Sequence, residues 1–247
     1  MRAARVMGIE VGRAFLEASG VKMPSGAFGS SCESLILRHG AADEVLGCRV
    51  SGNPLAEARD GAATTQGWEF DPELPGSRLI SWSGTFAEEF DGVDPRNWMA
   101  PGKTALDAFC ARVRPALERH EWTVCFQPHA RHVLSDARSC RDFLARHAGQ
   151  PFELALSPAS MLEASMLDRA EEHLERLIST LGPLASVVML EDVRASGAGL
   201  ERVPLGEGVL PLGVMRELVV EHVSASVPVV LRAESFAQQV EAVGLGE

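Results

Sequence analysis

From residue 79 onward, short hydrophobic runs alternate with longer segments in which hydrophobic residues recur at helical spacing. A short run bounded by Gly, Pro or polar residues is typical of a strand buried on both faces, and a spacing of three and four residues is typical of a helix that packs on one side. The predicted helices begin near Thr104, Ser135, Asp168, Pro211 and Ser235. The strands that alternate with them are predicted at 79–83, 122–126, 152–156, 187–191 and 227–231.

Residues at the predicted helix boundaries indicate where these helices start and stop. Ser135 is the predicted N-cap of the second helix, and Asp168 has a glutamate three residues on, which is the spacing of a capping box. Gly182 followed by Pro183 is predicted to end the third helix, because glycine is favoured just after a helix and proline cannot continue one. Pro115 lies inside the first helical pattern and predicts a kink or a restart there.

The first 78 residues have a weaker pattern. Strands are predicted at 6–11, 45–50 and 67–70, and a helix at 13–19. Segments rich in Gly, Ser and Asp surround them and are predicted to be loops. This part of the chain therefore does not predict regular strand and helix pairs.

The repeated alternation of strand and helix predicts an α/β fold. Five such pairs occupy about 170 residues, which extrapolates to seven or eight pairs in the whole chain and favours a (β/α)8 TIM barrel over an open doubly wound sheet. No linker divides the sequence, so residues 1–247 are predicted to form a single domain. We expect the N-terminal part to be irregular or incomplete, and a sheet edge left open there would be covered in a homodimer.

The composition narrows the range of partners. The chain has 247 residues, of which 46% are hydrophobic and 23% charged, as in ordinary globular proteins. Its net charge is −11 and its pI about 5.2, whereas nucleic-acid-binding surfaces carry a basic excess, so nucleic acid is not a predicted partner. No run approaches the roughly 18 hydrophobic residues of a membrane span, and no hydrophobic segment of a secretory signal precedes Glu10. We predict a protein that does not interact with membranes.

The cysteines predict a reducing environment. They lie at positions 32, 48, 110, 125 and 140, an odd number without any Cys-x-x-Cys spacing. Such a pattern predicts neither a disulfide framework nor a metal knuckle and favours the cytoplasm. Cys125 lies inside a hydrophobic run and is predicted to be a small core residue. No Gly-x-Gly-x-x-Gly or P-loop motif follows a strand, so no nucleotide site is predicted.

Two histidines follow the predicted strand 122–126. His129 or His132 could act as a general base or contact a substrate at the strand end. Arg131, between them, could hold a phosphate or carboxylate group. The alternative is a polar loop with ordinary solvated histidines.

Two carboxylates close the predicted strand 187–191. Glu191 and Asp192 are adjacent, so their side chains point to opposite sides of the strand and only one can face the mouth of a parallel barrel, where ligands bind. Asp192 is predicted either to contact a ligand or to accept hydrogen bonds from backbone N–H groups of the loop 204–208.

The last predicted strand ends in an arginine and a glutamate. An inward-facing Glu234 could work with His129 as an acid/base pair suited to an aldose–ketose shift or an epimerisation. A surface ion pair of Arg232 with Glu234 is the alternative. Trp82 and Trp68 either line the mouth as sugar-stacking surfaces or pack in the core.

Four motifs in the second half of the chain follow one another in a familiar order. They are Val-Cys-Phe-Gln-Pro-His at 124–129, Leu-Ala-Leu-Ser-Pro-Ala-Ser-Met at 154–161, Val-Met-Leu-Glu-Asp at 188–192 and Leu-Gly-Glu-Gly at 205–208. Together they resemble the xylose-isomerase-like sugar phosphate isomerase and epimerase family, whose strands end in Glu-Asn-His, in Asp and in His-x-Lys-Asp before a Leu-Gly-x-Gly loop. The resemblance covers roughly residues 120 to 235 and implies a TIM barrel that acts on a small carbohydrate.

The family that these motifs resemble binds one divalent metal ion (Mn, Mg, Zn or Co) through Glu, Asp, His and Glu at strand ends. The resemblance places the first three ligands on Gln127, Ser157 and Met189. It places the fourth on or near Arg232, or on Glu234 if the register slips by two residues. Hard cations prefer carboxylate oxygens, and Zn prefers imidazole or carboxylate groups. These four side chains therefore predict no metal site, and no cofactor is assigned.

Two functions from different classes follow. The first is a sugar or sugar phosphate isomerase or epimerase that acts by proton transfer, with the catalytic candidates His129, Glu191 and Glu234. Its predicted substrate contacts are Gln127, Arg131, Trp82, Asp192 and Arg232. The alternative is a non-catalytic relative that has lost the metal site and serves as a binding or interaction module. Metal-dependent phosphodiester cleavage, a further activity of the same superfamily, is disfavoured by the acidic charge and the substituted ligands.

Overall fold

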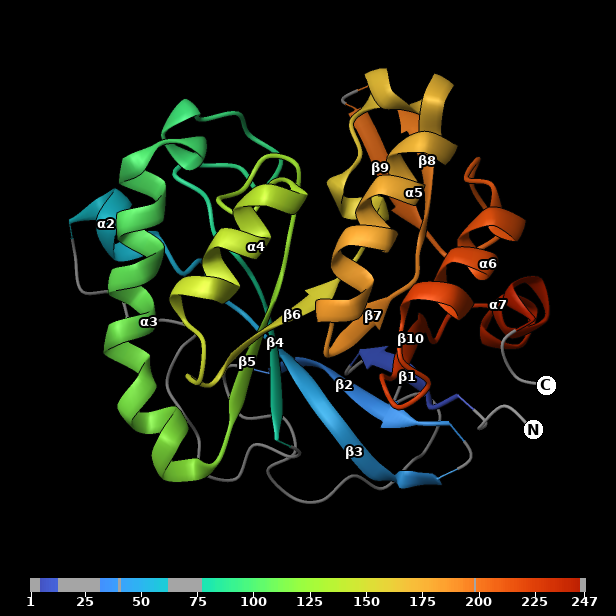
Figure 1. The fold of residues 1–247 in the computed structure, drawn as a ribbon, viewed down its shortest axis with the longest axis horizontal. Helices are drawn as coiled ribbons and strands as arrows, with labels where there is room; N and C mark the ends of the chain where they lie inside the picture. The colour runs from blue at the N-terminus through green and yellow to red at the C-terminus, as the bar shows by residue number, and fades with distance from the viewer. Residues whose placement is uncertain (1–4, 13–31, 40, 62–76, 198, 245–247) are drawn as a thin grey trace.

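The computed structural model describes residues 5–12, 32–39, 41–61, 77–197 and 199–244, and these form a closed eight-stranded barrel with helices on its outside (Figure 1). In order around the barrel the strands are β1 (Met7–Gly12), β10 (Val229–Arg232), β7 (Val187–Met189), β6 (Phe152–Leu156), β5 (Thr123–Gln127), β4 (Arg78–Trp82), β3 (Ala41–Val50) and β2 (Cys32–Arg38). The predicted α/β barrel is confirmed. The strands predicted at 67–70 and the helix predicted at 13–19 lie outside the described residues, as does Trp68.

One strand runs against the others. β2 pairs antiparallel with both β1 and β3, whereas the other six pairings around the barrel are parallel. β2 was not predicted, because its hydrophobic run spans only Leu35 to Leu37, between the polar Ser34 and the charged Arg38. The irregular N-terminal part is thus an antiparallel insertion. Because β1 pairs with both β2 and β10, the open edge on which the expectation of a homodimer rested is absent from the described barrel.

The helices connect the parallel strands and pack around them. They are α2 (Ala56–Asp60), α3 (Ala100–His120), α4 (Ala137–Arg146), α5 (Ala170–Leu181), α6 (Leu212–His222) and α7 (Phe236–Val243), with the 3-10 helices η1 (Pro95–Trp98), η2 (Ala159–Met161), η3 (Ala164–Arg169) and η4 (Gly182–Leu184). In Figure 1, α3 to α7 follow one another around one side of the barrel, and β2 and β3 lie on the other side. None of the described helices is long and apolar enough to cross a membrane.

Several predicted helix ends were wrong. The N-cap of α4 is Asp136 rather than Ser135, because the Asp136 carboxylate accepts the N–H of the third helical residue at 2.6 Å. Asp168 lies inside η3, so α5 begins two residues later without a side-chain cap. Gly182 has φ −54° and passes the chain into η4 instead of ending the helix in the left-handed conformation. Pro115 neither ends nor restarts α3, which continues through it.

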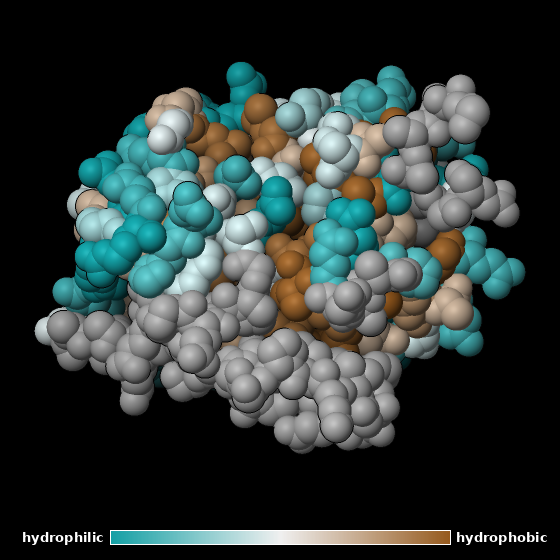
Figure 2. Space-filling view, turned by 90° about the horizontal axis from the view of Figure 1, so that it is seen from below, coloured by the Kyte–Doolittle hydropathy of each residue, from teal (hydrophilic) through white to brown (hydrophobic). Residues whose placement is uncertain are grey.

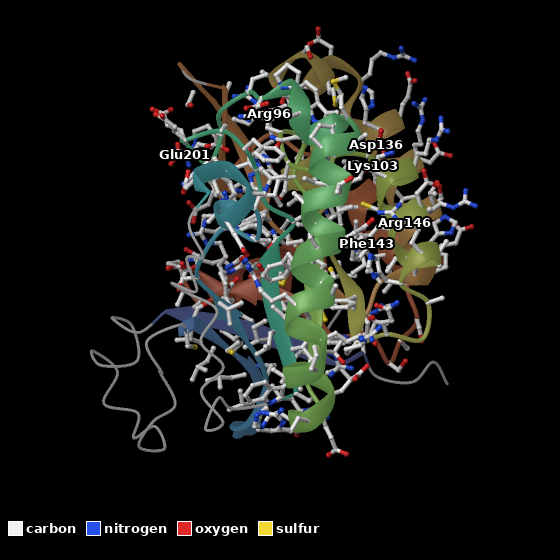
Figure 3. All side chains as sticks on the ribbon, turned by 90° about the vertical axis from the view of Figure 1, so that its left-hand side faces the viewer. Arg96, Lys103, Asp136, Phe143, Arg146 and Glu201 are labelled. Carbon is white, nitrogen blue, oxygen red and sulfur yellow. The ribbon has the colours of Figure 1, made fainter. Side chains whose placement is uncertain are left out.

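The chain after β7 forms a second, two-stranded sheet, although its Gly/Ser-rich stretch at 195–200 is typical of a loop. β8 (Asp192–Ser196) and β9 (Gly199–Val203) pair antiparallel along their full lengths and form a hairpin. Glu201 of this hairpin lies at the same end of the molecule as Arg96 and Asp136, which follow β4 and β5 (Figure 3). The hairpin therefore stands at the carboxyl end of the parallel strands, which is where barrel enzymes hold their ligands.

Hydrophobic side chains fill the barrel and the space between strands and helices. The barrel interior is packed by Ile36, Ile80, Cys125, Ala155, Val187, Met189 and Val230. Cys125 is thus a core residue, as predicted, and all five cysteines are buried thiols outside any disulfide. The outward-facing residues of the strands pack in a separate, larger core with α3 to α6. Figure 2 shows hydrophobic side chains gathered in the middle of the face that holds β2 and β3.

Candidate functional site

One side chain from each strand points into the mouth of the barrel. Because side chains alternate along a strand, the residue two positions beyond an interior core residue also faces inward. Gln127, for example, follows Cys125 in this way. β2 runs in the opposite direction, so its mouth residue, Ser34, precedes Ile36 and pairs with Arg49 of β3. The eight residues of this mouth ring are Glu10, Ser34, Arg49, Trp82, Gln127, Ser157, Glu191 and Arg232.

A cavity of about 670 Å³ lies above the mouth ring. This volume suits a small organic ligand. The ring contributes Glu10, Ser34, Arg49, Trp82, Glu191 and Arg232 to the cavity wall, and the surrounding loops and hairpin contribute His129, Arg131, Ser160, Glu163, Arg202 and Glu234 among others. Most of the residues predicted for the site therefore line one cavity, although Gln127 and Asp192 are fully buried beside it.

A buried ion pair closes the side of the mouth formed by β1, β2 and β3. The Glu10 carboxylate accepts hydrogen bonds from Arg49 Nε at 2.6 Å and Nη2 at 3.3 Å, and from Ser34 Oγ at 2.6 Å. Burial raises the pKa of Glu10, but the attraction and hydrogen bonds of Arg49, with Ser34 and Arg232, outweigh it and lower the pKa overall. Glu10 is therefore a paired carboxylate at neutral pH rather than a proton acceptor.

The rings of Trp82, Phe90 and His132 form an aromatic wall beside this ion pair. The Trp82 ring packs edge-on against Phe90, with ring centroids 4.8 Å apart. The guanidinium of Arg202, from β9, lies over the same indole with Cζ 4.6 Å from its centroid, and that of Arg49 at 5.4 Å. Trp82 thus lies at the mouth, where cation–π contacts hold two arginines against it.

Glu191 is the mouth-ring carboxylate with the weakest pairing. Its side chain is 13% exposed and lines the cavity. Ser157 Oγ donates to Glu191 Oε2 at 3.4 Å, and Arg202 Nη1 lies 4.0 Å from the same oxygen. A carboxylate with one long hydrogen bond and a distant cation retains lone pairs for a ligand.

Asp192 faces away from the mouth and braces the following loop. Its Oδ1 accepts the N–H groups of Val193 at 2.8 Å and Leu210 at 2.9 Å, and its Oδ2 accepts that of Gly206 at 3.2 Å. A Cβ on Gly208 would lie 2.3 Å from Asp192 Oδ1, so the loop can approach only with glycine there. These contacts match the alternative in which Asp192 accepts hydrogen bonds from the following loop. They do not include the predicted contact with a substrate.

The Asp192→Asn variant is expected to be less stable by about 2 kcal/mol, because an amide cannot accept all three buried N–H groups. Urea unfolding monitored by circular dichroism measures the change. Glu201→Gln, an exposed change on the same hairpin, is the control and should stay within about 0.5 kcal/mol of the unchanged protein. Equal stabilities of the two variants would contradict the bracing role.

His129 is buried at the cavity wall with both ring nitrogens engaged. The backbone N–H of Arg131 donates to Nδ1 at 3.2 Å, so Nε2 carries the proton and faces Asp91 Oδ1 at 3.2 Å. Burial, followed by His132, Arg202 and Arg131, lowers the pKa of His129 to about 2. In this arrangement the imidazole has no free lone pair with which to take a proton from a substrate, so the geometry does not support the predicted role as a base.

His132 belongs to the aromatic wall and not to a solvated loop. It is 1% exposed, and its Nε2 donates to the carbonyl of Phe90 at 3.0 Å. Burial lowers its pKa to about 4, with Arg202 acting in the same direction. The prediction of ordinary solvated loop histidines was therefore wrong.

The remaining charged candidates stand at the rim in pairs. Arg131 donates through Nε and Nη2 to the two oxygens of Glu163 at 2.9 and 3.1 Å. Arg232 lies 3.5 Å from Glu234 Oε2, and the Glu234 side chain is 59% exposed. Glu234 and His129 line the same cavity, but the contacts of Glu234 are those of the predicted surface ion pair.

The four strand ends that the resemblance links to a metal ion do not fit one. Gln127 donates to Ser160 Oγ at 3.3 Å, and the Ser157 and Ser160 hydroxyls share a hydrogen bond at 2.7 Å. Met189 is buried inside the barrel and Arg232 brings a positive charge. Within the described ranges, no three His, Cys, Asp or Glu side chains are grouped so that they could hold a metal ion. A cation would lack the anionic ligands that it needs.

Sequence reasoning missed four residues that shape the mouth: Glu10, Ser34, Arg49 and Arg202. A signal existed for two of them, because Glu10 and Arg49 are charged residues inside predicted strands, and a charge within a buried strand indicates a partner. Ser34 lies in a segment predicted to be a loop, and no strand was predicted around Arg202, so nothing indicated which way either side chain faces.

Comparison with known proteins found similarity only to solved structures at low sequence identity. No protein-family model and no curated protein matches the sequence. The chain resembles solved structures of sugar epimerases and isomerases. A D-psicose 3-epimerase in the presence of D-fructose is 14% identical with a TM-score of 0.46, and the match covers 63% of this chain and 49% of that chain.

Two further structures show the same level of likeness. A xylose isomerase domain protein from Planctomyces limnophilus is 13% identical with a TM-score of 0.49, over 69% of this chain and 58% of that chain. An L-ribulose 3-epimerase is 12% identical with a TM-score of 0.48, over 78% and 63%. This chain therefore matches 49% to 63% of the length of these structures. They are of the kind that the four motifs resemble, and the barrel assignment itself rests on the strand pairing.

Proposed function

We propose that this protein is a metal-independent isomerase or epimerase of a small carbohydrate, with Glu191 as the proton-transfer group. The supporting observation is the position of Glu191 on the cavity wall, weakly paired, opposite the Trp82 side of the mouth ring and 4.0 Å from the Arg202 guanidinium. Isomerisation and epimerisation both need a base next to a group that stabilises negative charge on oxygen.

The chemistry requires no redox partner. The Glu191 carboxylate would take a proton from the carbon next to the substrate carbonyl, and the electron pair of that C–H bond would move to the carbonyl oxygen. The Arg202 guanidinium would stabilise the resulting enediolate oxygen. For the isomer, the protonated Glu191 would return the proton to the neighbouring carbon, and the hydroxyl proton of the enediolate would move to the other oxygen so that the new carbonyl forms. For the epimer, water would deliver a proton to the opposite face of the same carbon, the carbonyl would form again, and the hydroxide that is left would take the proton of Glu191.

Exchange of carbon-bound hydrogen in D₂O tests this function directly. Proton NMR of a panel of aldoses, ketoses and their phosphates, each incubated with the protein, should show loss of the signal at the carbon next to the carbonyl. Glu191→Gln should slow this exchange by about 100-fold or more, which is the usual contribution of a general base. Glu175→Gln, an exposed change on α5, is the matched control and should leave the rate unchanged.

The same experiment separates the two functions predicted from the sequence. Exchange that persists in Glu191→Gln would remove Glu191 from the reaction. Binding of a sugar without any exchange would instead support the alternative, a binding module that has lost its chemistry.

A further inference from the structure

Two arginines at the mouth of the barrel have guanidinium N–H groups without a hydrogen-bond partner among the described residues. Arg202 makes no side-chain hydrogen bond to any residue that the structure describes, and its nearest carboxylate is Glu191 at 4.0 Å. Burial lowers the pKa of Arg202, and the like charges of Arg49 and Arg232 add to this, while Glu191 and Asp91 oppose it. A half-buried cation without hydrogen-bond partners is costly unless a ligand supplies them.

A second donor is free beside it. The Glu10 carboxylate holds Nε and Nη2 of Arg49, which fixes the plane of that guanidinium. The remaining Nη1 is buried and has no hydrogen-bond partner in the described part of the chain. Both guanidinium groups lie against Trp82, so the indole holds them on one side of the cavity.

Among the described residues, seven carboxylates line the cavity, and four of them, Glu10, Asp91, Glu163 and Glu234, are paired with groups other than Arg202. Glu10 is used by Arg49 and Ser34, and Glu234 is paired with Arg232. Arg232 Nη1 also donates to the carbonyl of Arg202 at 3.3 Å, which fixes the backbone that carries the Arg202 side chain. Planar guanidinium groups held in place in this way match the oxygens of carboxylate and phosphate groups.

We propose that the substrate of this site is a sugar derivative with an oxyanion group, a carboxylate or a phosphate, bound by Arg202 and by Nη1 of Arg49 against Trp82. This inference rests on the proposed function for its sugar part. The charged contact that holds the ligand would be an ion pair between the arginines and the anion, in place of a metal ion. A guanidinium has five N–H donors, so Arg202 would hold the anion with some of them and keep another for the enediolate oxygen, while Glu191 faces the carbon skeleton.

Calorimetric titration with four probes tests the inference: D-glucuronate, D-glucose 6-phosphate, D-glucose and inorganic phosphate. An anionic sugar should bind at least about 10-fold more tightly than D-glucose, because charged donors favour charged acceptors. Added NaCl should weaken that binding. The preferred anion among glucuronate and the phosphate probes identifies the source of the oxyanion.

Two variants at Arg202 and one control show whether this residue carries the binding. Arg202→Gln should weaken binding of the preferred anion by about 10- to 100-fold, and Arg202→Lys should weaken it less, because the charge remains while the planar fork is lost. Arg194→Gln removes an exposed arginine from the same hairpin and should leave affinity unchanged. Circular dichroism spectra that match the unchanged protein ensure that the variants are folded.

The inference and the proposed function can fail separately. If D-glucose binds as tightly as every anion, or if Arg202→Gln binds them normally, the anion site is overturned even when Glu191-dependent exchange is observed. If the anion binds through Arg202 but no hydrogen exchange occurs with any probe, the anion site stands and the isomerase function is lost.

Discussion

Glu10→Ala is expected to lower the free energy of unfolding by about 3 to 5 kcal/mol, because it leaves the Arg49 guanidinium buried without its counter-ion. The side chains of Arg49 and Glu10 are only 12% and 15% exposed, and three hydrogen bonds converge on the carboxylate. The variant therefore loses these bonds and keeps an unpaired charge. Urea unfolding of the purified protein measures the difference.

A second ion pair involving β3 provides the control. Arg38 and Glu44 are 3.0 Å apart but 41% and 50% exposed. Glu44→Ala should cost less than about 1 kcal/mol, because solvent screens this pair. A double variant of Glu10→Ala with Arg49→Ala should cost less than the sum of the two single changes. If Glu10→Ala costs no more than Glu44→Ala, the buried pair does not stabilise the barrel.

Stability is also expected to fall as the pH drops below about 6.5, because two imidazoles are buried in the neutral form. The folded protein holds the pKa of His129 at about 2 and that of His132 at about 4, against 6.5 for a free imidazole. Between pH 6.5 and pH 4 the unfolded chain binds protons that the folded chain does not. Each imidazole then costs about 1.4 kcal/mol of stability per pH unit, and this loss is absent above pH 6.5.

Urea unfolding at pH 7.5, 6.5, 5.5 and 4.5 measures this slope. At pH 4.5 the two imidazoles together should have removed roughly 5 kcal/mol. His132→Gln should reduce the slope by about half, whereas His173→Gln, a change on α5, should retain it. A flat profile between pH 7.5 and 5.5 would show that the imidazoles are charged in the folded protein. Glu10 acts at lower pH, because its pKa lies below 4.5.

The barrel could be predicted from the second half of the sequence because its strands are buried on both faces. Runs such as 154–156 and 187–190 are hydrophobic throughout, which is the pattern of a parallel strand under helices. β2 escaped prediction since only three hydrophobic residues mark it, and its pairing with β1 and β3 comes from distant contacts. The hairpin after β7 escaped because a Gly/Ser-rich stretch predicts a loop whether or not its flanks pair.

Site residues could be predicted where their position at the end of a strand places them at the mouth. They could not be predicted where the orientation or the partners of the side chain decide its role. Glu191 and Trp82 stand at predicted strand ends and both line the cavity, although for Trp82 the sequence left core packing open as an alternative. His129 was found at the cavity wall, but its protonation depends on two partners, a backbone N–H and Asp91, that no local pattern reveals. Arg202 depends on the hairpin register, which places it over Trp82.

The pairing of the first strand with the last has a consequence for the order of assembly. β1, β2 and β3 are joined by antiparallel contacts between neighbours in sequence, so they can form early, whereas the β1–β10 seam joins the two ends of the chain and carries the greatest loop-closure entropy. Glu10 and Arg232 face each other across that seam, so the mouth ring is complete only after this slow step. A ligand that binds the complete mouth ring would stabilise the pairing of β1 with β10 and delay the first opening of the barrel.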